Sequence, residues 1–272
     1  MIKDKKLTVV KSNELVEASY RLSLGEKRLL LACIAKLDSK GTRYAKKDGI
    51  TIKAQEFSQL FNIKTNNGYR DLEAAAENLF ERRISFDNKN HKIKYVSRWA
   101  GDIDYNYGEG SVTIHFSRRI LPFITQLKGQ FTKYQLEKIA GLTSAHAIRI
   151  YEICLQYLKI GSRDIEVDKL KKTLGVEELY SEFKDFNKRV LKPSVEQINK
   201  QTDLRIQINP IRKMRKVVAL KIDIRAKEKS HKKVSKQKIN SELKKIFSEE
   251  TQEIPFTEAK NEKLKKPSFT IQ

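Results

Sequence analysis

Apolar residues recur at helical spacing in two separate parts of the chain. The first part follows Ser23, which stands three positions before Glu26. This is the spacing of a capping box, in which the serine side chain caps the helix and the glutamate reaches back. Apolar residues then repeat three or four positions apart on one helical face in each half. They are Leu30, Cys33, Ile34 and Leu37 in the first half and Ala147, Ile148, Tyr151, Cys154, Leu155 and Leu158 in the second.

A shorter segment follows each of these helices, and its apolar residues have the same spacing in both halves. Four apolar positions are separated by 5, 4 and 2 residues. They are Ile52, Phe57, Phe61 and Ile63 in the first half and Ile165, Leu170, Leu174 and Val176 in the second. The spacing predicts a brief strand that enters a two-turn helix, which ends at a buried aliphatic residue.

A longer helix and alternating apolar runs complete each half. The helices are predicted over residues 69–80 and 183–198, where apolar residues again keep helical spacing. Alternating runs at 84–86 and 112–116, and at 204–208 and 218–224, predict strands. We expect the two runs of each half to pair as one β-hairpin.

The order of scaffold helix, short helix, long helix and hairpin is that of a winged helix-turn-helix. We therefore predict an α+β fold with two tandem winged helix-turn-helix domains that form a pseudo-repeat. Pro122 and Gly129 interrupt the pattern, so we assign residues 1–125 to an N-terminal domain and 126–227 to a C-terminal one. Residues 228–272 are rich in Lys and Glu and predict a flexible basic tail. Two unrelated α+β domains with coincident spacing are the alternative.

Composition narrows the class of partner. The 272 residues carry 56 Lys and Arg against 34 Asp and Glu, a formal net charge of +22. This surplus favours nucleic acid, with a lysine-rich surface without a partner as the alternative. The longest apolar run, residues 29–35, is shorter than the roughly 20 residues of a membrane-spanning helix. Residues 1–13 lack the apolar segment of a signal peptide, and Cys33 and Cys154 are expected to be reduced, so we predict a cytoplasmic protein.

The residues that catalysis would require are not grouped. Four histidines, His91, His115, His146 and His231, are scattered without a nearby ligand at metal-binding spacing. The chain has no GxxxxGK[ST] phosphate loop, and its tyrosines lack the histidine pair of a rolling-circle nuclease. We expect a protein that is not an enzyme and that needs no cofactor or metal.

Positive charge concentrates in the second half. The long helix there has a net charge of +3 over residues 183–200, and Lys184, Lys188 and Lys192 stand four positions apart, with Arg189 beside them. Such a stripe lies opposite the apolar face. The tip of the second predicted hairpin adds four more cations, at a place where a wing contacts phosphates or the minor groove. They are Arg212, Lys213, Arg215 and Lys216. We predict that this domain makes the main DNA contact; solvated lysines are the alternative.

The first long helix differs, because its net charge over residues 67–81 is −3. Its N-terminus still offers Asn67 and Arg70 beside free backbone N–H groups. The first predicted hairpin adds Lys89 and Lys92. We predict either an auxiliary DNA contact or a surface for self-association; the alternative is that this domain only packs.

Four stretches of the sequence resemble the replication initiator (Rep) proteins of iteron-containing plasmids. The likeness covers roughly residues 7–225. The stretches are VVKSNELVEASYRLSLGEKRLLLACIAKLD at 9–38, YRDLEAAAENLFERRI at 69–84, FTKYQLEKIAGLTSAHAIRIYEICLQY at 131–157 and FNKRVLKPSVEQINKQTDL at 186–204.

The resemblance implies a non-enzymatic initiator with two winged-helix domains. Such proteins bind direct repeats at a plasmid origin as monomers, help to melt an A+T-rich segment, and recruit the host replication initiator and replicative helicase. Dimers, joined mainly through the first domain, repress the initiator's own promoter or limit copy number. A winged-helix transcriptional repressor with no role in replication is the rival interpretation; a third is an RNA-binding or membrane-surface protein that uses the tail.

Two positions raise questions about local geometry. Members of the family often carry a glycine before the basic pair of the second hairpin, where this chain has Met214. Pro193 interrupts the second long helix, and its missing N–H and its ring predict a kink or an end near Lys192.

Overall fold

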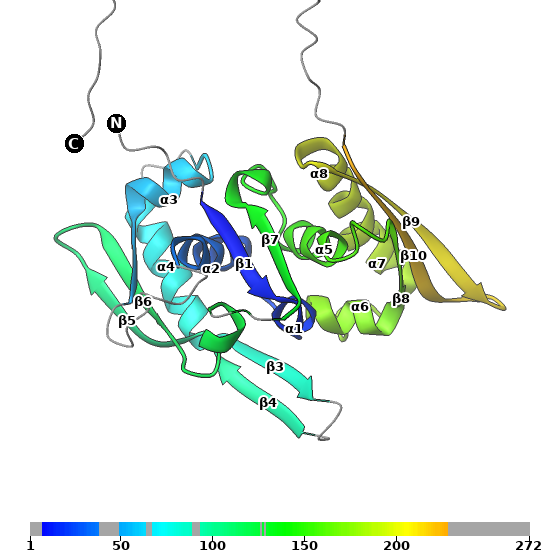
Figure 1. Ribbon diagram of the computed structural model, residues 1–272, viewed down its shortest axis with the longest axis horizontal. Helices are drawn as coiled ribbons and strands as arrows, with labels where there is room; N and C mark the ends of the chain where they lie inside the picture. Colours follow the sequence, from blue (N-terminus) through cyan, green and yellow to red (C-terminus); the bar gives the residue numbers. More distant parts are fainter. Residues whose placement is uncertain are drawn as a thin grey trace, which may run out of the picture. The chain divides into compact units, whose positions relative to one another are not determined.

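The two predicted scaffold helices are α2 (Leu24–Lys36) and α5 (Ala145–Leu155) in a computed structural model of the chain (Figure 1). The structure describes residues 7–37, 49–63, 67–88, 93–125, 127 and 129–227. The capping box at α2 is confirmed, because the N–H of Glu26 donates to Ser23 Oγ at 3.3 Å and the N–H of Ser23 donates to the Glu26 carboxylate at 3.1 Å. Ser144 caps α5 in the same way, with the N–H of Ala147 as donor. Both helices are almost wholly buried.

The strand that enters a short helix is present in both halves. Strand β2 (Ile50–Lys53) leads directly into α3 (Ala54–Leu60), and β8 (Ser162–Glu166) leads into α6 (Val167–Leu174). Helix α6 ends at Gly175, which has the left-handed φ of +68° that favours glycine at this position. A Cβ atom there would lie only 2.9 Å from the backbone of Tyr20. The short helices are therefore as the spacing predicts, but of the two aliphatic residues expected to be buried at their ends, Val176 is buried and Ile63 only partly so.

The long helices are α4 (Gly68–Glu81) and, in the second half, a continuous run of three segments. These are α7 (Phe183–Phe186), a π-helical turn (Asn187–Leu191, η3) and α8 (Lys192–Gln201). Of the two predicted alternatives, a kink or an end near Lys192, the end is wrong, because the helix continues to Gln201. The N–H of Lys192 donates to the carbonyl of Asn187, five residues earlier, so a wider turn carries the helix into the proline that lacks a donor.

Each half has a three-stranded antiparallel sheet with the same topology. The order is β2-β6-β5 in the first half and β8-β10-β9 in the second, so the strand before the short helix pairs with the last strand of the hairpin. The hairpins are β5 (Ala100–Asn106) with β6 (Ser111–Phe116), and β9 (Leu204–Lys213) with β10 (Lys216–Ala226). The two tandem winged helices and their pseudo-repeat are confirmed.

A separate hairpin is inserted in the first half, between α4 and β5. It consists of β3 (Arg83–Asn88) and β4 (Ile93–Arg98), which among the described residues pair only with each other apart from a bridge between Ser19 and Ser85. The prediction that the runs 84–86 and 112–116 form one hairpin is therefore wrong. Alternation identifies a strand by its buried face, but it does not identify the partner strand.

The start of the described chain lies beside the start of the second half. Strand β1 (Thr8–Ser12) pairs antiparallel with β7 (Phe131–Gln135), and α1 (Asn13–Glu17) then packs against α5 (Figure 1). Single 3-10 turns occur at Leu121–Phe123 and Leu136–Lys138. Buried apolar side chains of both halves join in one core cluster. The division at residues 125/126 remains a prediction, and the pairing of β1 with β7 crosses it.

Two further expectations concern single features of the chain. Cys33 and Cys154 are free and buried, as predicted. Within the described ranges, none of the helices is both long enough and apolar enough to cross a bilayer. The predicted tail, residues 228–272, lies outside the described residues.

Candidate nucleic-acid interface

The long helix of the second half presents its basic side chains to solvent. Lys184, Lys188, Arg189 and Lys192 are all exposed. The residues of the other face, Phe186, Val190 and Ile198, are at most 1% exposed. The predicted separation of a cationic face from a buried face is confirmed.

The π-helical turn keeps this basic face aligned. Buried residues stand four positions apart at Phe186, Val190, Ser194 and Ile198. A repeat of four exceeds the 3.6 residues of an α-helical turn, so in an ideal helix the stripe would drift around the axis. The wider π turn takes up part of that drift. As a result, the four cations that precede Pro193 stay on the face opposite the core.

The wing of the second half ends in an exposed basic turn. Lys213 pairs with Lys216 across the hairpin, so Met214 and Arg215 form a two-residue turn. Met214 is 95% exposed and has a φ of +54°, the conformation that glycine adopts without strain. The predicted cations of the tip, Arg212 through Lys216, are all exposed.

These two groups form what we call the basic surface. It comprises Lys184, Lys188, Arg189, Lys192, Arg212, Lys213, Arg215 and Lys216. None of the eight side chains makes an ion pair or a hydrogen bond with another residue of the described ranges. Eight cations that form no ion pair within the described ranges attract an extended anion, and a duplex presents phosphates at regular intervals.

The first half has a different surface at the equivalent helix. Asn67 and Arg70 at the N-terminal end of α4 are exposed, as predicted. Further along, Glu77 and Glu81 are also exposed, and Glu81 Oε1 lies 2.9 Å from Arg98 Nη1. Lys89 and Lys92, the other predicted cations of this half, lie outside the described residues. The structure therefore places only two of the four predicted side chains, at the end of an acidic helix.

The wing tip of the first half is aromatic and acidic. The β5–β6 connection contains Glu109, which lies 3.7 Å from Lys53 Nζ, and Tyr107, which is 72% exposed. The ring of Tyr107 lies 6.0 Å from that of Tyr69 and 6.5 Å from that of Tyr105. Sequence reasoning missed this tip because it assigned the wing to the wrong pair of strands. The turn-like run Asn106 to Gly110, between two alternating segments, was the signal that marks it.

Comparisons with known proteins agree with this geometry. Two family models match the chain, "Initiator Replication protein, WH1" over residues 8–155 and "Initiator Rep protein, WH2" over residues 166–224. The chain belongs to the initiator replication (Rep) protein family. The resemblance stated from the sequence is thereby confirmed.

Individual Rep proteins are similar over most of the described chain. A replication initiation protein of Escherichia coli is 31% identical over 212 residues, which cover 75% of this chain and 65% of that relative. The match thus spans slightly less than two thirds of the relative's length. The PI protein of Escherichia coli is 25% identical over 233 residues, covering 74% of this chain and 76% of the relative. A crystal structure of Pi initiator protein in complex with iteron DNA matches with a TM-score of 0.71 and 24% identity, covering 83% of this chain and all of that chain; it supports the same fold.

In this Rep protein, the side chain of Asn199 holds the second wing against its long helix, and the side chain of Asn209 joins the two strands of that wing. Asn199 of α8 donates to the carbonyl of Ile206 at 2.8 Å and accepts from the N–H of the same residue at 2.7 Å. Asn209 of β9 donates to Asp223 of β10 at 2.9 Å. The two parts of the basic surface are therefore held together. A single asparagine in an exposed helical pattern gives no sequence signal for this role.

Proposed function

We propose that this protein is a sequence-specific double-stranded DNA-binding protein that initiates plasmid replication at direct repeats of an origin. The observation that carries the proposal is the basic surface, in which a long helix and the adjacent wing present eight exposed cations. A long helix in the major groove with a wing on the backbone is how winged helices bind a duplex. The match to the Pi protein, which was crystallised with iteron DNA, supports the same partner.

The remaining parts of the proposal follow the family. The protein acts in the cytoplasm without enzymatic activity or a cofactor. It binds repeats as a monomer, promotes melting of a neighbouring A+T-rich segment, and recruits the host replication initiator and replicative helicase. As a dimer it represses its own gene. Two tandem readers one helical turn apart, roughly 10 bp, would cover a repeat of roughly 20 bp.

The direct test removes two cations from the reading helix. The variant Lys188→Ala plus Arg189→Ala should bind a 20-bp target duplex, selected from random sequence, roughly 10- to 100-fold more weakly than wild type. A matched control, Lys133→Ala plus Lys159→Ala, loses the same charge from exposed positions outside the basic surface and should bind nearly as well. Unchanged specific binding by the first variant would reject the assignment of the surface.

A second experiment distinguishes an initiator from a repressor. Purified protein is added to a supercoiled plasmid that carries several copies of the selected duplex beside an A+T-rich segment, and unpaired bases are detected chemically. An initiator should make the A+T-rich segment reactive. A protein that occupies the repeats without opening the duplex, and does not support plasmid replication in cells, would be a repressor.

A further inference from the structure

The first described residues form a segment whose polar partners lie mainly in the second half. We call residues 8–22 the N-terminal strap; it comprises β1, α1 and the extended chain up to α2. In sequence it belongs to the first winged helix. Its side-chain and backbone contacts, however, reach α5, β8 and the end of α6, which belong to the second.

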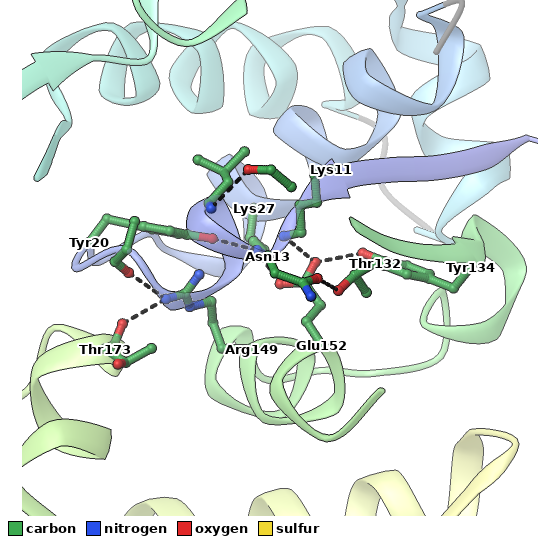
Figure 2. A network of polar contacts seen from close by, with 12 residues as sticks. Lys11, Asn13, Tyr20, Lys27, Thr132, Tyr134, Arg149, Glu152 and Thr173 are labelled. Carbon is green, nitrogen blue, oxygen red and sulfur yellow. Dashed lines mark hydrogen bonds and ion pairs between the residues drawn. The ribbon is translucent and has the colours of Figure 1, made fainter. Parts of the chain in front are cut away.

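The strap begins in a fully buried ionic network (Figure 2). Lys11 Nζ of β1 lies 2.5 Å from Glu152 Oε1 of α5, and Lys27 Nζ of α2 lies 2.9 Å from Glu152 Oε2. Tyr134 of β7 donates to the same carboxylate at 2.6 Å. The two lysines and the glutamate are each at most 1% exposed. One carboxylate thus joins strands and helices from both halves.

The middle of the strap is tied to β8. Arg163 donates to both oxygens of Glu17, at 2.7 and 3.0 Å, and Gln156 donates to Glu17 at 3.2 Å. The guanidinium of Arg163 is nearly buried. This paired geometry fixes direction as well as distance, because both N–H groups meet both oxygens.

The end of the strap is held from two sides. The backbone of Ser19 exchanges two hydrogen bonds of 3.1 Å with Ser85 of β3, in the first half. Its hydroxyl donates to the carbonyl of Lys172 at the end of α6, at 2.8 Å. Arg149 of α5 donates to the carbonyls of Ala18 and Thr173 at 2.8 and 2.7 Å (Figure 2). One residue is therefore bonded to both halves.

Such contacts define a position more than they add stability. Replacing a buried ion pair by apolar residues often leaves stability unchanged, whereas displacing one partner leaves an uncompensated charge. A shift of the strap would separate Lys11 from Glu152 and Glu17 from Arg163. At its far end, Gly175 lies so close to the backbone of Tyr20 that a Cβ atom would approach within 2.9 Å. These contacts therefore fix the strap in one position against the two halves.

We propose that the N-terminal strap sets the separation of the two winged helices and thereby the spacing of the DNA segments that one protomer contacts. Glu17, Ser19 and Arg163 are positioning residues, since none belongs to the basic surface. The part of the proposal that concerns DNA rests on the proposed function. The part that concerns the separation of the two halves does not.

Distances between labels on the two halves test the first part. Cys33 and Cys154 are fully buried, and burial raises the pKa of the Cys154 thiol to about 12, so cysteines introduced at exposed positions react selectively. Spin labels go on Ala74→Cys in α4 and Lys221→Cys in β10, both exposed. In Glu17→Gln plus Ser19→Ala, the distribution of label distances should become at least twice as wide as in wild type. Ser19→Ala alone, which leaves the ion pairs intact, should give a smaller broadening.

A matched control keeps this result interpretable. Glu81→Gln removes an ion pair with Arg98 inside the first half, and it should leave the distance distribution unchanged. Circular dichroism confirms that each variant is folded. A folded strap variant with the wild-type distribution would overturn the proposal.

Spaced target duplexes test the DNA part. Insertions of 1 to 5 bp at the centre of the selected target should weaken wild-type binding progressively, since 5 bp turns the two segments to opposite faces. Over the same series of insertions, the fold-decrease in affinity of the Glu17→Gln plus Ser19→Ala variant should be at most one third of the fold-decrease seen for wild type. An equal loss in both proteins, or no loss in wild type, would overturn the spacing role. Failure of the proposed function is separate, because it would appear as wild-type binding that the Lys188 and Arg189 substitutions do not weaken.

Discussion

The two winged helices of this chain share a topology and differ in what they present to solvent. In both, a strand enters a short helix, a long helix follows, and a hairpin pairs back on the first strand. The second long helix exposes a row of cations, and its wing tip is basic. The first long helix exposes carboxylates, and its wing tip carries Tyr107 and Glu109. Apolar spacing thus specifies the fold twice, whereas the exposed residues assign each copy a different role.

The largest expected effect is the salt dependence of DNA affinity, which the basic surface of the second copy should dominate. If 6–10 phosphates are neutralised, affinity for the target duplex should fall by roughly 10³–10⁵ between 50 and 200 mM salt. Changing the four cations of the second wing tip to alanine should lower the slope of log affinity against log salt by about 1 for each lost phosphate contact. Fluorescence anisotropy at five salt concentrations measures both slopes. If the affinity of wild type hardly changed with salt, the basic surface of the second copy would not be a phosphate-binding surface.

The buried ionic network around Glu152, which joins the two copies, should affect how the free energy of unfolding depends on pH. Burial lowers the pKa of Lys11 to about 8, against the opposing effect of Glu152, with Lys27, Tyr20 and Arg149 as further charged or titratable neighbours. Because the unfolded state then binds more protons than the folded state between pH 8 and 10, the free energy of unfolding should gain up to about 3 kcal/mol over this window. Above it, the raised pKa values of Tyr134 and Tyr151 act in the opposite direction.

Lys11→Met tests this, since methionine is unbranched and fills the same space without a charge. Denaturant unfolding from pH 7 to 10 should show a smaller rise in the variant than in wild type. The control Lys133→Met removes an exposed lysine from the neighbouring strand and should keep the full rise. An unaltered rise in Lys11→Met would show that other groups titrate in this window.

A smaller effect is expected at the N-terminus of α4. Arg70→Ala should weaken binding to the target duplex by about 2- to 10-fold and lower the salt slope by about 1, if the first copy makes an auxiliary phosphate contact. Light scattering on the same samples measures oligomer mass. A changed mass with unchanged affinity would assign this end of the helix to self-association instead.

The smallest expected effect concerns the residue at positive φ in the turn of each wing. The first wing places Gly110 at a φ of +59°, whereas the second places Met214 at +54°. A residue with a Cβ atom is strained by roughly 1–2 kcal/mol in this conformation. Glycine avoids that strain, but its greater conformational freedom in the unfolded chain offsets part of the gain in stability. Met214→Gly should therefore stabilise the protein by about 0.5–1 kcal/mol in thermal unfolding, with little change in DNA affinity. Destabilisation would show that the methionine side chain makes contacts that matter.

The sequence predicts those parts of the molecule that depend on local apolar spacing. The 5, 4 and 2 spacing identifies β2 with α3 and β8 with α6, and the stripe at Lys184, Lys188 and Lys192 identifies the exposed face. The inserted β3–β4 hairpin was not predicted, since the partner of a strand depends on the whole sheet. The π turn before Pro193 was not predicted either, because the pattern signals a break but not how the helix accommodates it.

The polar contacts of the strap leave no local trace in the sequence. Lys11 follows two valines in β1, and Glu152 stands within the apolar run of α5. Each reads alone as an ordinary surface residue. Only the pairing of β1 with β7 brings them together in the core, so their role requires the tertiary structure.

The strap also has a consequence for the order in which the protein folds during synthesis. Residues 8–22 are synthesised well before their partners, since Arg163 is made 146 residues after Glu17 and Lys172 is made 153 residues after Ser19. Contacts between residues so far apart form late, after the intervening chain has been built. The strap must therefore wait for its partners until α5, β8 and α6 of the second winged helix have emerged, and translation products truncated before that point would leave it unanchored.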